Sequence, residues 1–381
     1  MEPIYLDHAA TTPVHPDVIA EMQDMLTDVF GNPSSIHSFG RKARHLLDEA
    51  REIAASSIGT KEKNIVFTSG GTEADNLALI GTALANKDKG NHIITSQIEH
   101  HATLHAAHYL EKHGFEVTYL PVDETGRVRL EDVQRALKEQ TIVVSIMAVN
   151  NETGVIQPIQ EIGELLQQHP AYFHTDAVQA FGLMDIHVDD WKVDLLSVSS
   201  HKINGPKGIG FLYVREGVKM TNLQFGGEQE RKRRPGTENL VGIRGFQKAI
   251  EISQQERELR TKKYSLYKKI FLDTLKENDV NFSINGEESH MIPNIINISF
   301  PRTNVEALLT NFDLEGIASS SGSACTAGSV DPSHVLSAMF GADHDKTKNS
   351  VRFSFGLANT EENVKEAAGK VSKVISRLAK D

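Results

Sequence analysis

One lysine stands where a cofactor could be held covalently. Lys202 follows the apolar run at residues 193–200 and precedes the Gly/Pro-rich turn NGPKG, so we expect it at the carboxyl end of a strand. Ligands of open α/β sheets bind at that edge. The amine could form a Schiff base there, while Ser199 and His201 hold a phosphate. The alternative is a solvent-exposed loop lysine, which is common in a chain with 40 basic residues.

A carboxylate at a second strand end has a matching role. Asp176 ends the apolar stretch 171–177 and lies 26 residues before Lys202. Pyridoxal phosphate needs a carboxylate against its ring nitrogen, because the protonated ring is an electron sink. Gln179 could donate to the phenolate oxygen of the same ring. A turn aspartate is the alternative, although an aspartate among apolar residues is costly unless it is paired.

Two further motifs suit an anion and an aromatic ring. Gly70 and Gly71 separate a predicted strand from a helix in TSGGTEADN, where backbone N–H groups and the Thr72 hydroxyl could bind an anion. Most Gly-Gly turns bind nothing, so this signal is weak alone. His100 follows the predicted strand 92–97, and its imidazole could stack on a cofactor ring and handle protons.

Cys325 is the chain's one cysteine, and it lies in SSSGSACTAG at residues 319–328. A free cysteine is often a small buried hydrophobe. Its serine and glycine neighbours indicate a loop instead, because they supply little apolar surface for a core strand. The local sequence therefore leaves a reactive thiol and a structural residue both open.

The elements that must position these residues alternate in type. Apolar runs typical of buried strands are separated by helical patterns, which predicts an α/β fold with a mostly parallel sheet covered on both faces. The helical pattern from residue 239 to about 275 predicts a long connecting helix. A smaller α+β segment follows, ending in a helix from Glu361. The predicted strands of the main sheet are 64–68, 92–97, 115–120, 141–149, 171–177, 193–200 and 208–214.

Composition excludes several protein classes. The 51 acidic residues exceed the 40 basic ones, and a net charge of −11 argues against direct nucleic-acid binding. One cysteine excludes an intrachain disulfide framework and fits a reducing compartment. The first residues lack the features of a signal peptide, and no apolar stretch approaches a membrane span. We therefore expect a cytoplasmic protein without membrane contact.

Two patterns imitate binding sites. His101 and His105 have the spacing of a metal pair, but the stretch lacks an H-E-x-x-H glutamate and a cysteine pair, so we expect no metal and a solvated helix face. The basic run RKRR at residues 231–234 is typical of a solvated loop, although it could meet tRNA or an acidic protein.

Together the motifs resemble one known family, the NifS/IscS-type cysteine desulfurases. The matching segments run in family order from Tyr5 to Gly356, so the resemblance covers nearly the whole chain. They are YLDHAATTPVHP, FGNPSSIHSFG, TSGGTEADN, EHHA, VNNETGVIQPI, HTDAVQ, SSHKINGPKGIG, RPGTEN, SSGSACTAG and VRFSFG. The resemblance implies fold-type I of the pyridoxal-phosphate enzymes. It implies a large domain with a mainly parallel seven-stranded sheet at residues 16–260, and a small domain formed by residues 1–15 and 261–381.

The resemblance also implies a role for each site residue. Lys202 matches the Schiff-base lysine, and Cys325 matches the nucleophile that takes sulfur from L-cysteine as a persulfide and leaves L-alanine. The remaining matches concern the cofactor and the substrate. They are Asp176 at the ring nitrogen, Gln179 at the phenolate oxygen, His100 stacked on the ring, Gly71, Thr72, Ser199 and His201 around the phosphate, Thr237 reaching the phosphate of the other subunit of a homodimer, and Asn151 and Arg352 at the substrate carboxylate.

The sulfur acceptor and two alternative functions stay open at this stage. The long segment around Cys325 favours delivery to a protein thiol, either of a tRNA-thiolating enzyme or of an iron–sulfur scaffold. The chain stops at Asp381, without the further tail of some scaffold-feeding members. A selenocysteine lyase or an aminotransferase of the same fold is the alternative enzyme. A scaffold protein that lost the chemistry would not keep Lys202, Asp176 and Cys325 together.

Overall fold

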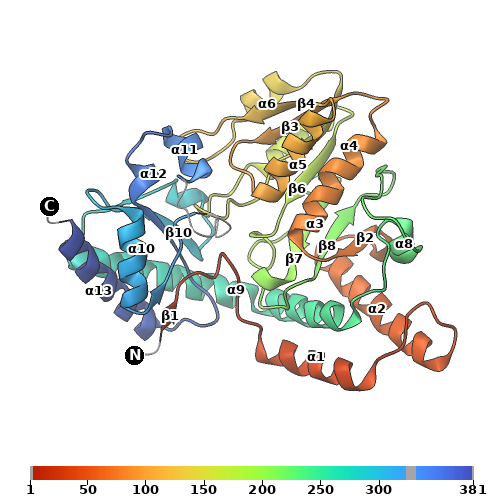
Figure 1. The fold of residues 1–381 in the computed structure, drawn as a ribbon, viewed down its shortest axis with the longest axis horizontal. Coiled ribbons are helices and arrows are strands. Elements are labelled where there is room, and N and C mark those ends of the chain that lie inside the picture. The colour runs from red at the N-terminus through yellow and green to blue at the C-terminus, as the bar shows by residue number, and fades with distance from the viewer. Residues whose placement is uncertain (1–2, 323–331, 380–381) are drawn as a thin grey trace.

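A seven-stranded sheet forms the centre of the larger part of the molecule (Figure 1). The computed structural model describes residues 3–322 and 332–379. Strand β8 runs antiparallel to both its neighbours and the other pairs are parallel, which confirms the expected mainly parallel sheet. In sheet order the strands are β2 (Ile65–Thr68), β8 (Gly210–Val214), β7 (Leu195–Ser199), β6 (Tyr172–Asp176), β5 (Thr141–Ser145), β3 (His92–Ser96) and β4 (Glu116–Leu120).

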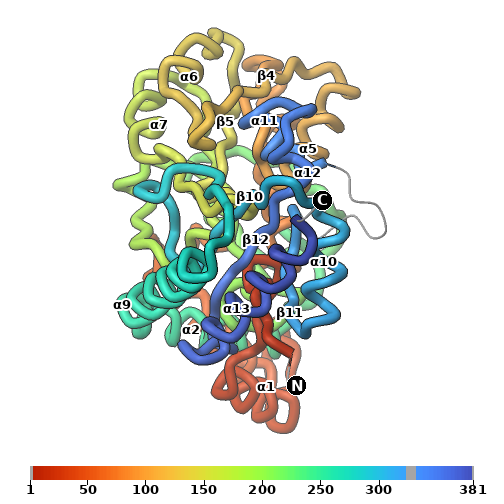
Figure 2. The backbone as a smooth tube through the Cα atoms, turned by 90° about the vertical axis from the view of Figure 1, so that its left-hand side faces the viewer, coloured from red at the N-terminus to blue at the C-terminus, as the bar shows by residue number. Residues whose placement is uncertain are grey.

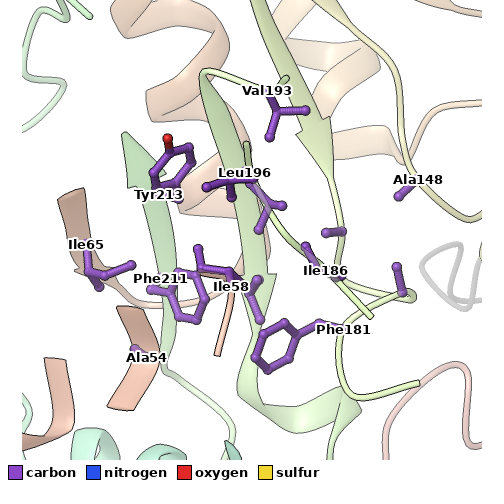
Figure 3. Packing of buried hydrophobic residues seen from close by; sticks show 14 of the residues in the cluster. Ala54, Ile58, Ile65, Ala148, Phe181, Ile186, Val193, Leu196, Phe211 and Tyr213 are labelled. Carbon is purple, nitrogen blue, oxygen red and sulfur yellow. The ribbon is translucent and has the colours of Figure 1, made fainter. Parts of the chain in front are cut away.

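Adjacent residues of a strand point to opposite faces of the sheet. In this sheet, apolar clusters cover both faces. Leu196, Phe211 and Tyr213 pack with Phe181 and Ile58 in the largest apolar cluster (Figure 3). Their strand neighbours belong to separate clusters on the other face, which also contain residues of the helical stretch 71–112. The sequence of these strands is mostly apolar for this reason, although β7 contains Ser197 and Ser199.

A second, smaller core surrounds an antiparallel sheet of β12 (Ser350–Ser354), β10 (Ile295–Ser299) and β9 (Ser283–Ile284). Phe271, Phe300, Phe312 and Phe353 are fully buried there. The N-terminal strand β1 (Ile4–Tyr5) pairs with β11 (Ile317–Ala318), so the two ends of the chain share this core. The predicted boundaries at residues 15–16 and 260–261 stay a prediction.

Helix α9 (Leu240–Glu277) runs from one core to the other (Figures 1 and 2). It packs against α1 (Pro16–Asp28) and α2 (Ser38–Ser56) at one end and α13 (Glu361–Leu378) at the other. Its bounds agree closely with the long helix expected from residue 239.

The other helices are short. They are α3 (Gly71–Asn76), α4 (Thr82–Ala85), α5 (His101–Lys112), α6 (Leu130–Ala136), α7 (Ile159–Leu166), α8 (Gln229–Lys232), α10 (Val305–Leu314), α11 (His334–Phe340) and α12 (Lys346–Asn349), with 3₁₀ turns at Glu62–Asn64, Ser200–Lys202 and Glu288–His290 and a π-helical turn at Leu77–Gly81. Within the described ranges, none of the helices combines the length and the apolar character that a membrane span requires.

Candidate active site

A cavity of about 250 Å³ lies where the strands of the main sheet end, and the N-terminal segment and β12 close it. Every predicted site residue except Thr237 and Cys325 lines this cavity. The lining residues are Ala9, Ala10, Gly71, Thr72, Asp75, His100, Met147, Asn151, Asp176, Val178, Gln179, Ser199, His201, Lys202 and Arg352. The fold thus brings together residues that are up to 343 positions apart in the sequence, the separation between Ala9 and Arg352.

Lys202 ends the 3₁₀ turn that follows β7. Its ammonium group donates to the backbone carbonyls of Ala9 and Ala10, the latter at 2.9 Å. Carbonyl oxygens orient the amine but carry no full charge that would fix its proton. The N-terminal segment therefore holds a primary amine in the cavity, and Asp176 lies at the end of the neighbouring strand β6.

Asp176 is 6% exposed, and its Oδ1 accepts a hydrogen bond of 2.9 Å from the amide of Val178. Burial raises the pKa of Asp176 to about 6, because an apolar surrounding disfavours the charged form, while the charge of Lys202 acts in the opposite direction. A cationic partner in the cavity would favour its ionised form further. Gln179 lies one turn further on, and its amide donates to the carbonyl of Ala9 at 3.0 Å.

Two histidines of the cavity are neutral near pH 7. Burial lowers the pKa of His100 and of His201 to about 4, and the charge of Lys202 adds to this effect for both. His100 caps α5, because its Nδ1 accepts from the amide of Ala102 at 3.1 Å. A neutral imidazole that accepts at Nδ1 carries its proton on Nε2. His100 is therefore a hydrogen-bond donor at Nε2 while this cap is formed.

Arg352 of β12 is 1% exposed and already has two partners. Its guanidinium donates to the carboxylate of Asp7 and to the backbone carbonyl of Asn151, both at 2.8 Å. The Nε atom is buried and has no hydrogen-bond partner among the described residues. The arrangement holds a fixed positive charge beside Asn151 at the edge of the cavity.

The start of α3 forms the wall beside Ser199. Gly70 has φ of +149°, a conformation that residues with a side chain rarely adopt. A Cβ atom on Gly71 would approach a methyl carbon of Val178 to 3.0 Å, so the side chain of Val178 would have to shift to admit one. Thr237 is exposed and does not line the cavity of its own chain. Cys325 lies outside the described residues.

Sequence reasoning missed a second carboxylate in the cavity. Asp75 is 1% exposed, and its Oδ1 lies 3.7 Å from Nε2 of the buried His174. Burial and the nearby charge of Asp176 raise the pKa of Asp75 well above its usual range. Both nitrogens of His174 contact serine hydroxyls, those of Ser145 and Ser197. Asp75 lies between Ala74 and Asn76 inside TSGGTEADN, a motif that had been assigned only to anion binding, and the polar residues around it gave no sign that it is buried.

The structure also shows the surroundings of the His101/His105 pair and of the basic run at residues 231–234. His101 and His105 stack with ring centroids 5.2 Å apart, and His101 also contacts His334 at 4.8 Å. Among the described residues, no group of three or more potential ligands is placed to hold a metal ion. In the basic run, Arg231, Lys232 and Arg234 form ion pairs with Glu62, Glu228 and Glu73, respectively.

The donor set of this cavity fits a phosphorylated pyridine aldehyde. The buried carboxylate of Asp176 suits a protonated ring nitrogen, and the amine of Lys202 suits an aldehyde. Hydroxyl and imidazole groups from Thr72, Ser199 and His201 suit a phosphate. The amide of Gln179 completes the set with a donor for a ring oxygen.

Comparisons with known proteins agree with this geometry. The model of the family "Aminotransferase class-V" matches residues 4–366. The "Putative cysteine desulfurase IscS 1" of Bacillus subtilis (strain 168) is 58% identical over 99% of this chain and 100% of its own. The "Cysteine desulfurase IscS" of Dictyoglomus turgidum is 46% identical over 98% of this chain and 95% of its own. A solved structure titled "NIFS-LIKE PROTEIN" is 35% identical, with a TM-score of 0.92, and covers 99% of this chain and 100% of its own.

Proposed function

Because the chain belongs to the class-V aminotransferase family, we propose a residue-level account of its reaction. The protein is a pyridoxal-phosphate-dependent cysteine desulfurase, as its relatives of 58% and 46% identity over nearly the whole chain show. One observation supports the roles that we assign: Lys202, Asp176, His100 and Arg352 all line the same cavity.

We propose that the cavity holds the cofactor through the residues named above. Lys202 binds the aldehyde carbon, Asp176 the ring nitrogen and Gln179 the phenolate oxygen. Gly71, Thr72, Ser199 and His201 bind the phosphate, and the imidazole of His100 lies against the ring. Pyridoxal phosphate, when bound, supplies an electron sink for the bonds around the substrate's α-carbon.

The substrate L-cysteine is oriented by its carboxylate. Arg352 and Asn151 bind this group, and the buried Nε of Arg352 is a donor that has no partner among the described residues. A guanidinium is well suited to a carboxylate, because two parallel hydrogen bonds fix both distance and direction. The pair with Asp7 keeps the guanidinium in place before the substrate arrives.

The sulfur then passes to Cys325. The Cys325 thiolate attacks the Sγ atom of the substrate, so a new S–S bond forms as the Cβ–Sγ bond breaks. The electron pair of the broken bond stays on the substrate carbon, which takes up a proton and leaves as L-alanine. Cys325 retains the transferred sulfur as a persulfide, which needs no added oxidant or reductant.

Replacing Cys325 by serine tests this role. Cys325→Ser should retain bound cofactor and bind L-cysteine, yet release neither L-alanine nor sulfide, because the hydroxyl is a poor sulfur nucleophile. The measurements are the absorbance spectrum and product analysis. Normal turnover by this variant would contradict the role of Cys325.

We infer that the enzyme is a homodimer. Phe30 and Phe39 are 77% and 53% exposed and their ring centroids lie 5.1 Å apart, and neighbouring exposed apolar side chains are typical of an interface. Thr237 is exposed outside the cavity of its own chain, as a residue that serves the partner's phosphate site would be. Sedimentation should show a dimer, and a cofactor-loaded active monomer would contradict the proposal.

For the acceptor we propose a cysteine-containing partner protein, with a tRNA-thiolating enzyme favoured over an iron–sulfur scaffold. The acidic balance of the chain, −11, argues against direct contact with tRNA and favours transfer through a protein. Radiolabelled sulfur on Cys325 should move to the cysteine of a purified tRNA-thiolating enzyme. Transfer to a scaffold protein alone would contradict the choice of acceptor but not the desulfurase activity.

A further inference from the structure

A row of buried polar side chains interrupts the apolar face of the main sheet that α3 covers. His174 and Asp176 are two residues apart on β6, so their side chains point to the same face. In register beside them lie Ser145 of β5 and Ser197 of β7. Phe173, which points to the opposite face, belongs to the largest apolar cluster. Buried polar groups are costly unless they are hydrogen-bonded, so this row needs partners.

The histidine of the row is held by hydroxyls on both sides. Nδ1 of His174 lies 2.8 Å from the hydroxyl oxygen of Ser145, and Nε2 lies 2.9 Å from that of Ser197. Burial lowers the pKa of His174 to about 3, so its imidazole is neutral near pH 7. A neutral imidazole has one donor and one acceptor nitrogen, and two hydroxyls can satisfy both. His174 therefore has its hydrogen bonds without a charged partner.

Asp75 reaches this row from α3 and belongs to the cavity as well. Its Oδ1 lies 3.7 Å from Nε2 of His174 and has no hydrogen-bond partner among the described residues. It lines the cavity together with Asp176, although it is only 1% exposed. Burial and the charge of Asp176 raise the pKa of Asp75 well above its usual range, while a hydrogen bond from Ser197 acts in the opposite direction. Of the two carboxyl groups, Asp75 is therefore the one that keeps its proton.

Ser197 connects Asp75 with the rest of the row. Its hydroxyl contacts Nε2 of His174 and forms the hydrogen bond with the carboxyl group of Asp75. It is also the register neighbour of Asp176. A serine hydroxyl has a single proton to donate. While Asp75 accepts that proton, Ser197 cannot donate it to Asp176, and the carboxylate of Asp176 is kept for a group in the cavity.

We propose that Asp75 is a positioning residue for Asp176, and that it acts as a hydrogen-bonding group on Ser197 rather than as a second counter-charge. The inference rests on the proposed role of Asp176 at the ring nitrogen of pyridoxal phosphate. A carboxylate that accepts the ring N–H makes a charge-assisted hydrogen bond, which a competing donor weakens. Removal of Asp75 lets the Ser197 hydroxyl turn toward Asp176 and compete in this way.

The ring nitrogen can be tested by changing one position of the ligand. Cofactor-free protein is titrated with pyridoxal phosphate and with its analogue in which a C–H group replaces the ring nitrogen, and the bound fraction is measured by equilibrium dialysis. The readout is the ratio of the two Kd values, analogue over cofactor. General damage to the fold or to the phosphate site weakens both ligands and leaves this ratio unchanged. A change at the carboxylate that faces the ring nitrogen alters it.

The variants separate a hydrogen-bonding role from a charge. Asp75→Ala should lower the ratio by at least about tenfold, the order of effect of one hydrogen bond to a charged group. Asp75→Asn should stay within about threefold of wild type, because its amide is uncharged and keeps an acceptor oxygen for Ser197. The double variant, Asp75→Ala with Ser197→Ala, should recover most of the loss, because the competing hydroxyl is gone.

Thr82→Val is the matched control. Thr82 begins α4, is fully buried and does not line the cavity, and its hydroxyl has no hydrogen-bond partner among the described residues. The substitution therefore removes a buried polar group from the same helical stretch without touching the row. Its ratio of Kd values should equal that of the wild type.

Three results would overturn the proposal. The first is a wild-type ratio in Asp75→Ala. The second is an equal fall in Asp75→Asn, which would make Asp75 a second counter-charge, and the third is a loss that the double variant does not recover. Asp176→Asn, measured alongside, separates this from the proposed function. That variant should lose the preference for the ring nitrogen, and a full preference would refute the role of Asp176 itself, whatever the variants of Asp75 show.

Discussion

The two cationic side chains of the cavity, Lys202 and Arg352, are both held by the N-terminal segment, but in opposite ways. Lys202 donates to the neutral carbonyls of Ala9 and Ala10. Arg352 donates to the carboxylate of Asp7, only two residues earlier in the chain. One segment thus orients an amine through backbone carbonyls, and a guanidinium through a carboxylate.

The difference corresponds to the role that we propose for each group. An amine that forms and exchanges a covalent bond must be able to lose its proton, and a carbonyl partner leaves that proton mobile. A guanidinium that orients a carboxylate needs a constant charge and a constant place, and Asp7 supplies the place. The comparison predicts that changes at Lys202 abolish the chemistry, whereas changes at Arg352 and Asp7 weaken substrate binding.

The largest effect is expected at Lys202. Lys202→Ala should lose the covalent link to the cofactor, so that borohydride no longer fixes cofactor to the protein, and turnover should fall by at least about 10³-fold. Lys202→Arg is the control, because it keeps the charge beside Ala9 and Ala10 without a nucleophilic amine. Covalent trapping in Lys202→Ala would show that another group holds the cofactor.

A moderate effect is expected at Arg352. Arg352→Lys should weaken binding of L-cysteine by about 1–3 kcal/mol, the range of a charged hydrogen bond, because a lysine cannot form the two parallel contacts. Cofactor affinity should stay unchanged. The check is a titration with L-cysteine followed by absorbance, and identical affinity in the variant would remove Arg352 from the substrate site.

A smaller effect of the same kind is expected at Asp7. Asp7→Asn keeps an acceptor oxygen for Arg352, but it removes the charge and replaces the oxygen that accepts from Ser320 by an NH2 group. KM for L-cysteine should rise by an amount equivalent to about 1 kcal/mol, a typical net value for one hydrogen bond, while kcat changes little. A fall in borohydride trapping at Lys202 would contradict the separation of the two cations.

The smallest effect is expected on stability, at Glu99, the buried residue that directly precedes His100 in the sequence. Burial raises the pKa of Glu99 from 4.5 to about 8 in the folded protein. The folded state therefore holds a proton that the unfolded state releases, so stability is lost as the pH rises from about 4.5 to about 8. Glu99→Gln should flatten this part of the pH profile of the melting temperature of cofactor-free protein.

The exposed Glu161 on α7 provides a control for that measurement. Glu161→Gln should leave the pH profile as it is in the wild type, because it changes an exposed side chain and leaves Glu99 in place. If Glu99→Gln and wild type lose stability in parallel between pH 4.5 and 8, the carboxyl of Glu99 is not the group that takes up the proton.

The sequence was informative where a residue's surroundings are set by its own strand. Asp176, Ser199 and Lys202 follow apolar runs, so their place at the sheet edge could be predicted. The fold was predictable for the same reason, since strands apolar on both faces require cover on both sides. Asp75 could not be predicted, because its place in the cavity depends on how α3 packs over strands far away in the sequence.

Contacts between residues that are far apart in the sequence could not be predicted either. Nothing in the spacing of Asp7 and Arg352 indicates an ion pair, since the two residues meet only when β12 lies beside the N-terminal segment. The same holds for the hydrogen bond between Glu152 and Ser333. Motif matching had assigned Asn151 a role but left its buried neighbour Glu152 without one.

The central claim is that sulfur from L-cysteine arrives on Cys325 in a cavity organised by Lys202 and Arg352. Mass spectrometry of the peptide containing Cys325, after one turnover with ³⁵S-labelled L-cysteine and no acceptor, tests it most directly. The account predicts labelled sulfur on this peptide, removable by dithiothreitol, in a quantity equal to the L-alanine formed. L-Alanine formed without any label on Cys325 would contradict it.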